Sequence, residues 1–251
     1  MNKTLTPKRI IEAQTILGQA WYNRRHSLEY QKNEMPHKLD ANALAEVLQS
    51  FVFNFLFCHC TNSNFRQLCE NNGCNTQEIL SHFHTSLFTD EERKIFCEIS
   101  PSPDRLQRVV NILSHPNLLS QFDKRPTEFA RNFGACFEGT LAYKANPKDF
   151  SFEADRSRLK SKGTFYTDPE LTDCLVKLTF EDMATNETFP LDQKVLDPAM
   201  GAGNFLLEVL EYFVQHQIDN PQTENQKGNL FDLKQKTLSK CIFGADKDQL
   251  T

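Results

Sequence analysis

The sequence predicts an α + α/β protein, in which an N-terminal helical domain is followed by the beginning of an α/β domain with an incomplete sheet. Apolar residues recur at helical spacing through the first half of the chain. A stretch with few large aliphatic residues then separates this half from the rest. In the second half, Val195–Leu210 reads "VLDPAMGAGNFLLEVL", the pattern of a strand, a tight glycine turn and a helix. These observations predict domains at 1–143 and 163–251, joined by a linker at 144–162.

The composition is typical of an ordinary soluble protein. The 251 residues are 39% hydrophobic and 24% charged, with a formal net charge of −5. A net negative chain has no overall attraction for nucleic acid, so a DNA contact requires a local patch or another chain. The longest apolar run, around Phe51 to Phe57, is far too short to cross a bilayer, and the N-terminus lacks the apolar core of a signal peptide. We therefore expect no membrane partner, a cytoplasmic location and eight reduced cysteines.

Three helix starts support the helical domain. Thr6 and Pro7 match a cap followed by a first-turn proline. Asp40 opens the clearest helix, and Ser102 with Pro103 opens another. The apolar positions that these helices are expected to present on one face are Ile10, Ile11, Leu17, Trp21, Leu44, Val47, Leu48, Phe51, Val52, Phe55, Leu56, Leu106, Val109, Val110 and Leu113.

Two features of the first half leave alternatives open. The Phe-rich helix, Leu44 to Phe57, is apolar nearly all round, which fits a buried core helix or a partner-binding face. A group of sulfur and imidazole side chains suggests zinc: Cys58, His59, Cys60, Cys69, Cys74, His82 and His84. Their spacing is not that of a zinc finger, and free cysteine also behaves as a small hydrophobic residue. We therefore expect no metal site.

The expected linker carries alternating basic residues, and a helix and a strand are expected after it. Arg156, Arg158, Lys160 and Lys162 suit either DNA phosphates or a solvated linker. The next helix begins at a cap-like Thr-Asp-Pro, 167–169, and its expected apolar face consists of Leu171, Cys174, Leu175 and Leu178. The last apolar piece, Cys241–Ala245, is expected to be a buried strand ending in an acid.

The glycine turn itself indicates a ligand without identifying it. Glycine lacks a Cβ and accepts positive φ, so a ligand can approach the backbone closely. A nicotinamide fingerprint would need a third glycine where Leu206 stands, and its ribose-binding acid would come about twenty residues later, whereas Asp246 lies much further along. A P-loop would need Gly-Lys-Ser/Thr, which does not follow. Dinucleotide and ATP sites are therefore excluded, and a purely structural turn remains an alternative.

With its companion motifs, the turn resembles the cofactor site of adenine-specific N6 DNA methyltransferases of restriction–modification systems. Their first motif, Asp-Pro-x-x-Gly-x-Gly-x-Phe-Leu, is matched by Asp197, Pro198, Gly201, Gly203, Phe205 and Leu206. Their second motif, an acid just after a glycine at the end of the next strand, is matched by Gly244 and Asp246. In the type I and type IIG-like subgroup a Gly-x-Phe-Tyr-Thr segment comes first, matched by Gly163, Phe165, Tyr166 and Thr167. Upstream, Cys136–Tyr143 resembles a Tyr-Glu-x-Leu-Leu helix, with Phe137 in the tyrosine position.

The resemblance, which covers roughly 132–251, implies a Rossmann-like domain that transfers a methyl group from S-adenosylmethionine to adenine N6 in DNA. It implies that Asp197 neutralises the cationic methionine part, that the turn amides face the carboxylate, and that Asp246 accepts from the ribose hydroxyls. The cofactor-binding residues that it implies are Phe165, Tyr166, Thr167, Asp197, Pro198, Ala199, Gly201, Gly203, Phe205 and Asp246. Its implied partners are DNA and, in such systems, specificity or restriction subunits.

The family's catalytic motif, Asn/Asp-Pro-Pro followed by an aromatic residue, is not in the sequence. The near match Asn146–Phe150 has Lys148 in place of the second proline and precedes the cofactor motifs, so we interpret it as a loop. No catalytic residue is therefore assigned, and we expect the cofactor-binding front part of a larger enzyme, inactive by itself. The alternatives are a methyltransferase acting on RNA or a protein amide, and a non-catalytic remnant whose helical half is an interaction module.

Overall fold

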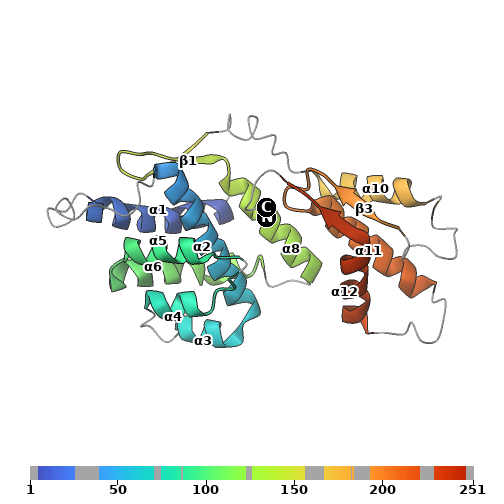
Figure 1. Ribbon diagram of the computed structural model, residues 1–251, viewed down its shortest axis with the longest axis horizontal. Coiled ribbons are helices and arrows are strands. Elements are labelled where there is room, and N and C mark those ends of the chain that lie inside the picture. The colour runs from blue at the N-terminus through green and yellow to red at the C-terminus, as the bar shows by residue number, and fades with distance from the viewer. Residues whose placement is uncertain are drawn as a thin grey trace. The chain divides into compact units, whose positions relative to one another are not determined.

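The computed structural model describes residues 5–25, 40–70, 75–85, 87–122, 126–155, 167–181, 183, 193–220 and 229–246. The chain divides into two compact units, Met1–Gly163 and Thr164–Thr251, which we call the helical unit and the α/β unit. The helical unit contains α1 (Leu5–Arg25), α2 (Ala41–Thr61), α3 (Ser63–Glu70), α4 (Thr76–Ser81), α5 (Asp90–Ile99), α6 (Pro103–Leu113), α7 (Pro116–Leu119), α8 (Pro126–Thr140), β1 (Tyr143–Ala145) and β2 (Phe152–Ala154) (Figure 1). The α/β unit contains α10 (Pro169–Phe180), β3 (Val195–Asp197), α11 (Asn204–Asp219), α12 (Leu230–Cys241) and β4 (Ile242–Gly244).

The helical unit is built around α2, which begins where the sequence predicts. Asp40 Oδ1 accepts hydrogen bonds from the backbone N–H groups of Asn42 and Ala43 at 2.8 Å each, which caps the helix. The helix lies against α1, α3, α5 and α6 (Figure 1). Its length and composition alone would let it cross a membrane, but most of it is buried inside the unit. Of the two alternatives for Leu44 to Phe57, the structure shows the buried core helix.

Phenylalanine rings fill the centre of the helical unit. Phe51 of α2 stacks on Phe96 of α5 with ring centroids 3.9 Å apart, and Phe83 lies 5.3 Å from Phe51. Phe55 meets Phe65 of α3 edge to face at 5.1 Å. Offset and edge-to-face pairs of this kind add to the stabilisation from burial. The aromatic residues of α2 therefore join helices that lie on either side of it.

The first part of the segment expected to be a linker is an antiparallel hairpin. Tyr143 pairs with Ala154, and Ala145 pairs with Phe152. Phe150 lies in the turn between the two strands, where it is 1% exposed and its ring covers Gly18 of α1. Phe150 anchors the hairpin turn to α1, and the buried Ala145 of β1 adds a second apolar contact. The described part of the expected linker ends at 155, so 156–162 with its four basic residues lies outside the described residues.

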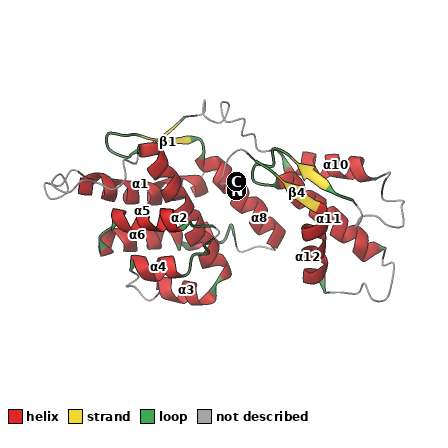
Figure 2. Ribbon diagram, in the orientation of Figure 1, coloured by secondary structure: helices red, strands yellow, loops and turns green. Residues whose placement is uncertain are grey.

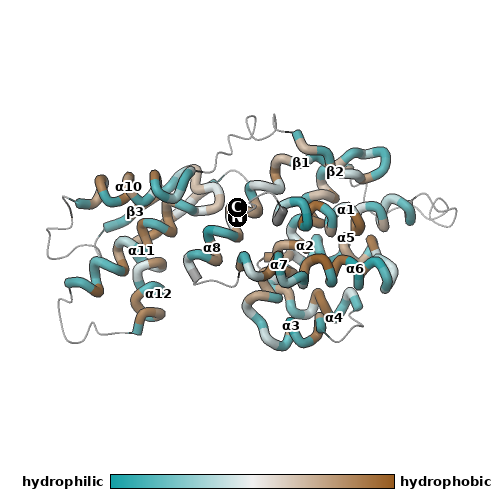
Figure 3. Tube along the Cα trace, turned by 180° about the vertical axis from the view of Figure 1, so that it is seen from behind, coloured by the Kyte–Doolittle hydropathy of each residue, from teal (hydrophilic) through white to brown (hydrophobic). Residues whose placement is uncertain are grey.

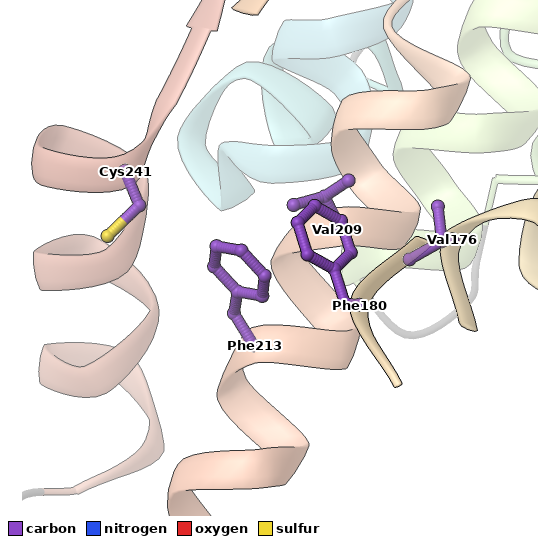
Figure 4. Packing of buried hydrophobic residues seen from close by; sticks show 5 residues of the cluster. All are labelled: Val176, Phe180, Val209, Phe213 and Cys241. Carbon is purple, nitrogen blue, oxygen red and sulfur yellow. The ribbon is translucent and has the colours of Figure 1, made fainter. Parts of the chain in front are cut away.

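In the α/β unit, β3 and β4 pair in parallel, with Val195 opposite Ile242 and Asp197 opposite Gly244. Figure 2 shows the strands of the described chain as two short pairs among helices. On one face of the β3–β4 pair, Val195 and Ile242 pack against a buried cluster from α10, α11 and the end of α12: Val176, Phe180, Val209, Phe213 and Cys241 (Figure 4). A Rossmann-like sheet stays a prediction, because two paired strands do not define a strand order.

The prediction of a buried strand at Cys241–Ala245 is wrong in two respects. Cys241 is the last residue of α12, and the strand begins at Ile242. Leu196 and Phe243, which are opposite each other in the register, are 63% and 43% exposed. Neighbouring paired residues share one face of a sheet, so the described helices cover only the other face of this strand pair.

The start of α10 is predicted correctly, but its buried face is not. Asp168 Oδ1 accepts from the Glu170 N–H at 2.9 Å, and Pro169 occupies the first turn. The side chains that α10 buries are Thr172, Val176 and Phe180, whereas Leu171, Leu175 and Leu178 are exposed. Hydrophobic and hydrophilic residues alternate along α10 and α11 in Figure 3, so composition does not distinguish the two faces. The contact with α11 selects the face that carries Phe180.

Candidate functional site

The predicted glycine turn connects β3 to α11. Asp197 ends the strand, and Gly203 stands at the cap position immediately before α11. Gly201 has φ of 52° and Gly203 has φ of 76°, both in the left-handed region where a side chain is strained. At Gly203 no atom of the described residues lies within 4 Å of the place where a Cβ would stand. The backbone conformation therefore explains both glycines, and the described part of the chain leaves the space beside Gly203 open.

The chain following β4 holds this turn in place. Ala245 N–H donates to the Asp197 carbonyl at 2.9 Å, and Met200 N–H donates to the Ala245 carbonyl at 3.0 Å. Gly201 N–H donates to Asp246 Oδ2 at 2.9 Å. Parallel strands end at the same edge of their sheet, which brings the acids Asp197 and Asp246 to one place although 48 residues separate them in the sequence.

Both acids bind backbone amides of the turn. Asp197 Oδ1 accepts from the Ala199 N–H at 3.0 Å, while Asp246 receives the Gly201 N–H. An ionised carboxylate has about four acceptor positions on its two oxygens, so a bond to a backbone amide does not occupy all of them. The structure thus gives each acid a part in shaping the turn, which the sequence motif did not predict.

Gly244 is required by close packing. A Cβ at this position would collide with the side chain of Met200 and would stand 2.8 Å from Leu206 Cδ1. Met200 also accepts the Gly203 N–H on its carbonyl at 2.8 Å, which tightens the turn before α11. Met200 is therefore a structural part of the site that the motif treated as a variable position. The only feature of the sequence that could have identified Met200 is its position between Pro198 and Gly201.

Asn204, the first residue of α11, is a second residue that the motif left out. Its Oδ1 atom is buried, and it accepts no hydrogen bond from the part of the chain that the structure describes. The amides of a first helical turn have no partner within their helix, and they carry the positive end of its dipole. The beginning of α11 thus combines a buried acceptor with donors suited to a carboxylate or another anionic group.

The other predicted site residues have different surroundings. Pro198 and Ala199 are exposed in the turn. Phe205 is partly buried and packs against the core cluster of the α/β unit, so its ring supports α11. Thr167 is partly buried directly before the cap of α10. Gly163, Phe165 and Tyr166 lie outside the described residues.

The near match to a catalytic motif, Asn146–Phe150, is the turn of the β1–β2 hairpin. Asn146 Oδ1 accepts from the Lys148 N–H at 2.9 Å, and Phe150 N–H donates to the Asn146 carbonyl at 2.9 Å. Phe150 has φ of 55°, and its ring is buried against Trp21 with centroids 6.4 Å apart. The side chains of this segment therefore close a turn and anchor it.

Of the cysteine and histidine group, Cys58, His59 and Cys69 are buried in the core, whereas Cys60 and His82 are partly buried and His84 is exposed. Cys58 Sγ donates to the His82 carbonyl at 3.3 Å, and burial raises the pKa of the Cys58 thiol to about 11. Burial also lowers the pKa of His59, and the nearby Arg66 guanidinium lowers it further. Within the described residues, three or more His, Cys, Asp or Glu side chains do not gather in a geometry that could hold a metal. Cys74 lies outside those residues.

Comparison with known proteins identifies one similarity. Residues 133–251 match the family model of N-6 DNA methylases, a segment that contains all ten predicted cofactor-binding residues. This match supports an adenine DNA methyltransferase family for that part of the chain. No curated protein and no solved structure matches the chain.

Proposed function

We propose that the chain takes part in S-adenosylmethionine-dependent methylation of adenine N6 in DNA, with the turn between β3 and α11 as part of the cofactor site. The observation that carries the proposal is the bond from Gly201 N–H to Asp246 at 2.9 Å, which joins two motifs far apart in the sequence into one site. The N-6 DNA methylase match of 133–251 contributes the reaction class. We also propose a role in restriction–modification or phage defence, in the cytoplasm.

The residues fit the chemistry of this cofactor. S-adenosylmethionine carries a carboxylate, which the first-turn amides of α11 can bind, and cationic groups, which an acid can neutralise. Its ribose hydroxyls and its ammonium are hydrogen-bond donors, which suits the carboxylate oxygens of Asp197 and Asp246 and the buried Asn204 Oδ1. The open space at Gly203 would let a ligand reach the backbone.

We assign the roles accordingly. Asp246 would accept from the ribose hydroxyls, and Asp197 would neutralise the cationic methionine part. The backbone of Gly201 and Gly203 would admit the ligand, and Pro198, Ala199 and Phe205 would shape the turn and support α11. Phe165 and Thr167 would close over the methionine part, as the resemblance implies, and Tyr166 would belong to the same cofactor-binding segment. The bound cofactor would supply a methyl group made electrophilic by its sulfonium.

The other half of the reaction, activation of the adenine, needs side chains that the cofactor-binding residues do not supply. The N6 lone pair of adenine is delocalised into the ring, so hydrogen-bond acceptors and an aromatic face are required to activate and hold the base. The sequence has no consecutive prolines and hence no Asn/Asp-Pro-Pro motif to supply them. We therefore propose that this chain contributes the cofactor site, and that DNA and a complementing polypeptide segment complete the enzyme. Specificity or restriction subunits are further proposed partners.

Equilibrium dialysis of the whole chain with radiolabelled S-adenosylmethionine tests this proposal. We expect Asp246→Ala to weaken binding about tenfold or more, since hydrogen bonds to charged groups contribute about 1.5–3 kcal/mol. Asp246→Asn, which keeps an acceptor for Gly201 N–H, is expected to lose less. Asp219→Ala, an exposed acid at the far end of α11, is the matched control and should bind normally. Equal affinity for the Asp246→Ala and Asp219→Ala variants, or no binding by the unaltered chain, would contradict the proposal.

A further inference from the structure

A pocket in the helical unit lies where α1, α2, the end of α8 and the β1–β2 hairpin meet. The cavity there has a volume of about 40 Å³. Gln14 of α1 and Gln49 of α2 lie along it together with Thr140 of α8, and all three side chains are buried. Tyr143 and Phe152 of the hairpin contribute aromatic rings. The pocket belongs to the helical unit alone and is separate from the turn of the α/β unit.

Gln14 is the main indication that the pocket binds a ligand. Its side chain is 2% exposed, and its buried Oε1 atom accepts no hydrogen bond from the residues that the structure describes. An unmet buried acceptor costs about 1–3 kcal/mol, so such a group calls for an explanation in a folded protein. Because Gln14 lines the pocket, a ligand with a hydrogen-bond donor would satisfy this atom.

The neighbouring polar groups place acceptors beside Gln14, together with the amide of Asn42 and the hydroxyl of Tyr143, which can also donate. Gln49 Nε2 donates to Thr140 Oγ1 at 2.7 Å, and Thr140 Oγ1 donates its hydrogen to the Phe137 carbonyl at 2.7 Å. The hydroxyl hydrogen is thus used, and the oxygen keeps one lone pair. Glu46 adds a carboxylate, and none of the lining residues that the structure describes is Lys, Arg or His. This electrostatic bias disfavours an anion and favours a cation.

The apolar part of the lining selects an organic cation over a metal ion. Tyr143, Phe152 and Leu141 offer rings and methyl groups, whereas hard metal cations require six or more oxygen ligands. Aromatic faces attract ammonium groups through their quadrupole. We propose that this pocket binds a primary ammonium group, which would donate to Gln14 Oε1 and to the acceptors beside it. The group could belong to a small free amine or to a lysine side chain.

Titration of the whole chain with n-propylammonium, followed by calorimetry and by thermal unfolding, tests the proposal. We expect saturable binding and a rise in the melting temperature of the helical unit, and neither effect with n-propanol, which has the same chain without the charge. Nα-acetyl-lysine amide distinguishes the two sources: tighter binding than n-propylammonium indicates a lysine side chain, and weaker binding indicates a small free amine. A response to n-propanol equal to that of n-propylammonium, or no saturable response to either amine, would overturn the proposal.

Substitutions at the pocket give a second test. Gln14→Met keeps the volume and removes the unmet acceptor, so the variant should fold at least as stably and bind n-propylammonium about tenfold more weakly or worse. Gln19→Met, at an exposed position of the same helix, is the matched control and should bind normally. Glu46→Gln should weaken binding a few-fold, because the carboxylate is exposed. Unchanged binding by Gln14→Met would contradict the assignment. S-adenosylmethionine affinity should be the same in all three variants, so this test is independent of the proposed function.

Discussion

The two acids of the glycine turn show how single residues are positioned by the backbone that they support. Asp197 accepts a hydrogen bond from Ala199 N–H at 3.0 Å, and Asp246 accepts one from Gly201 N–H at 2.9 Å. Both amides belong to the same turn. A carboxylate held in this way has little rotational freedom left to lose when a ligand arrives, which reduces the entropic cost of binding. A substitution at Asp246 therefore affects the turn as well as any ligand, and the Asp246→Asn variant is needed beside Asp246→Ala.

The burial of individual thiols predicts which cysteines react with an alkylating reagent. Desolvation raises the pKa of the Cys58 thiol to about 11 and that of Cys136 to about 12, whereas Cys97 and Cys174 are exposed. Only the thiolate is nucleophilic, so we expect iodoacetamide at pH 8 to modify Cys97 and Cys174 in the native protein, and Cys58 and Cys136 only after unfolding in urea. Peptide mass spectrometry measures the modification at each site. Native labelling of Cys58 at the rate of Cys97 would contradict the described burial.

At the scale of elements, the hairpin β1–β2 is held to α1 by one close contact. A Cβ on Gly18 would fall within the ring of Phe150, so the glycine makes room for the anchor of the hairpin turn. The ring also meets Phe152 edge to face at 5.6 Å. Gly18 and Phe150, which are more than a hundred positions apart, are therefore expected to be energetically coupled. A double-mutant cycle measures this coupling energy.

We predict that Gly18→Ala lowers the free energy of unfolding of the helical unit by about 1–3 kcal/mol, because overpacking displaces Phe150. Phe150→Ala should by itself cost about 3–5 kcal/mol. In the Phe150→Ala background, Gly18→Ala should become neutral or stabilising, since alanine has the higher helix propensity by about 1 kcal/mol. Urea unfolding of the four proteins provides the cycle. Additive losses would mean that the two residues are not coupled.

On the scale of the whole molecule, the chain consists of two compact units with separate cores. Phe51 lies at the centre of the aromatic core of the helical unit, and Phe213 lies in the core cluster of the α/β unit (Figure 4). Both side chains are fully buried. Units with their own cores can unfold separately, so a substitution in one core should lower mainly the stability of that unit.

We therefore predict two unfolding transitions in differential scanning calorimetry. Phe51→Ala and Phe213→Ala should each remove about 3–5 kcal/mol and lower the melting temperature of one transition by roughly 10 °C or more, leaving the other in place. S-adenosylmethionine should raise only the transition that Phe213→Ala lowers, since the proposed cofactor site belongs to the α/β unit. A single transition that both substitutions lower equally would show that the units unfold together.

The sequence by itself determined the local features of this protein. Capping side chains and first-turn prolines act within a few residues. The starts of α2 and α10 could therefore be predicted from the sequence, at Asp40 and Asp168. The strand–turn–helix at 195–210 was equally local, because positive φ at Gly201 and Gly203 is a property of those residues. The family motifs then indicated the cofactor class, which the match of 133–251 supports at the level of DNA N-6 methylases.

Only the tertiary structure decided which surfaces meet. The buried face of α10 carries Phe180 instead of Leu171 and Leu178, and the choice depends on where α11 lies, which no helical period encodes. The hairpin inside the expected linker depends on Phe150 meeting Gly18, and the unmet acceptor of Gln14 becomes visible only when four elements close around it. The bond between Gly201 and Asp246 exists because parallel strands end at the same edge of a sheet. Contacts between residues distant in sequence arise from packing in three dimensions, and a pattern read along one chain does not contain them.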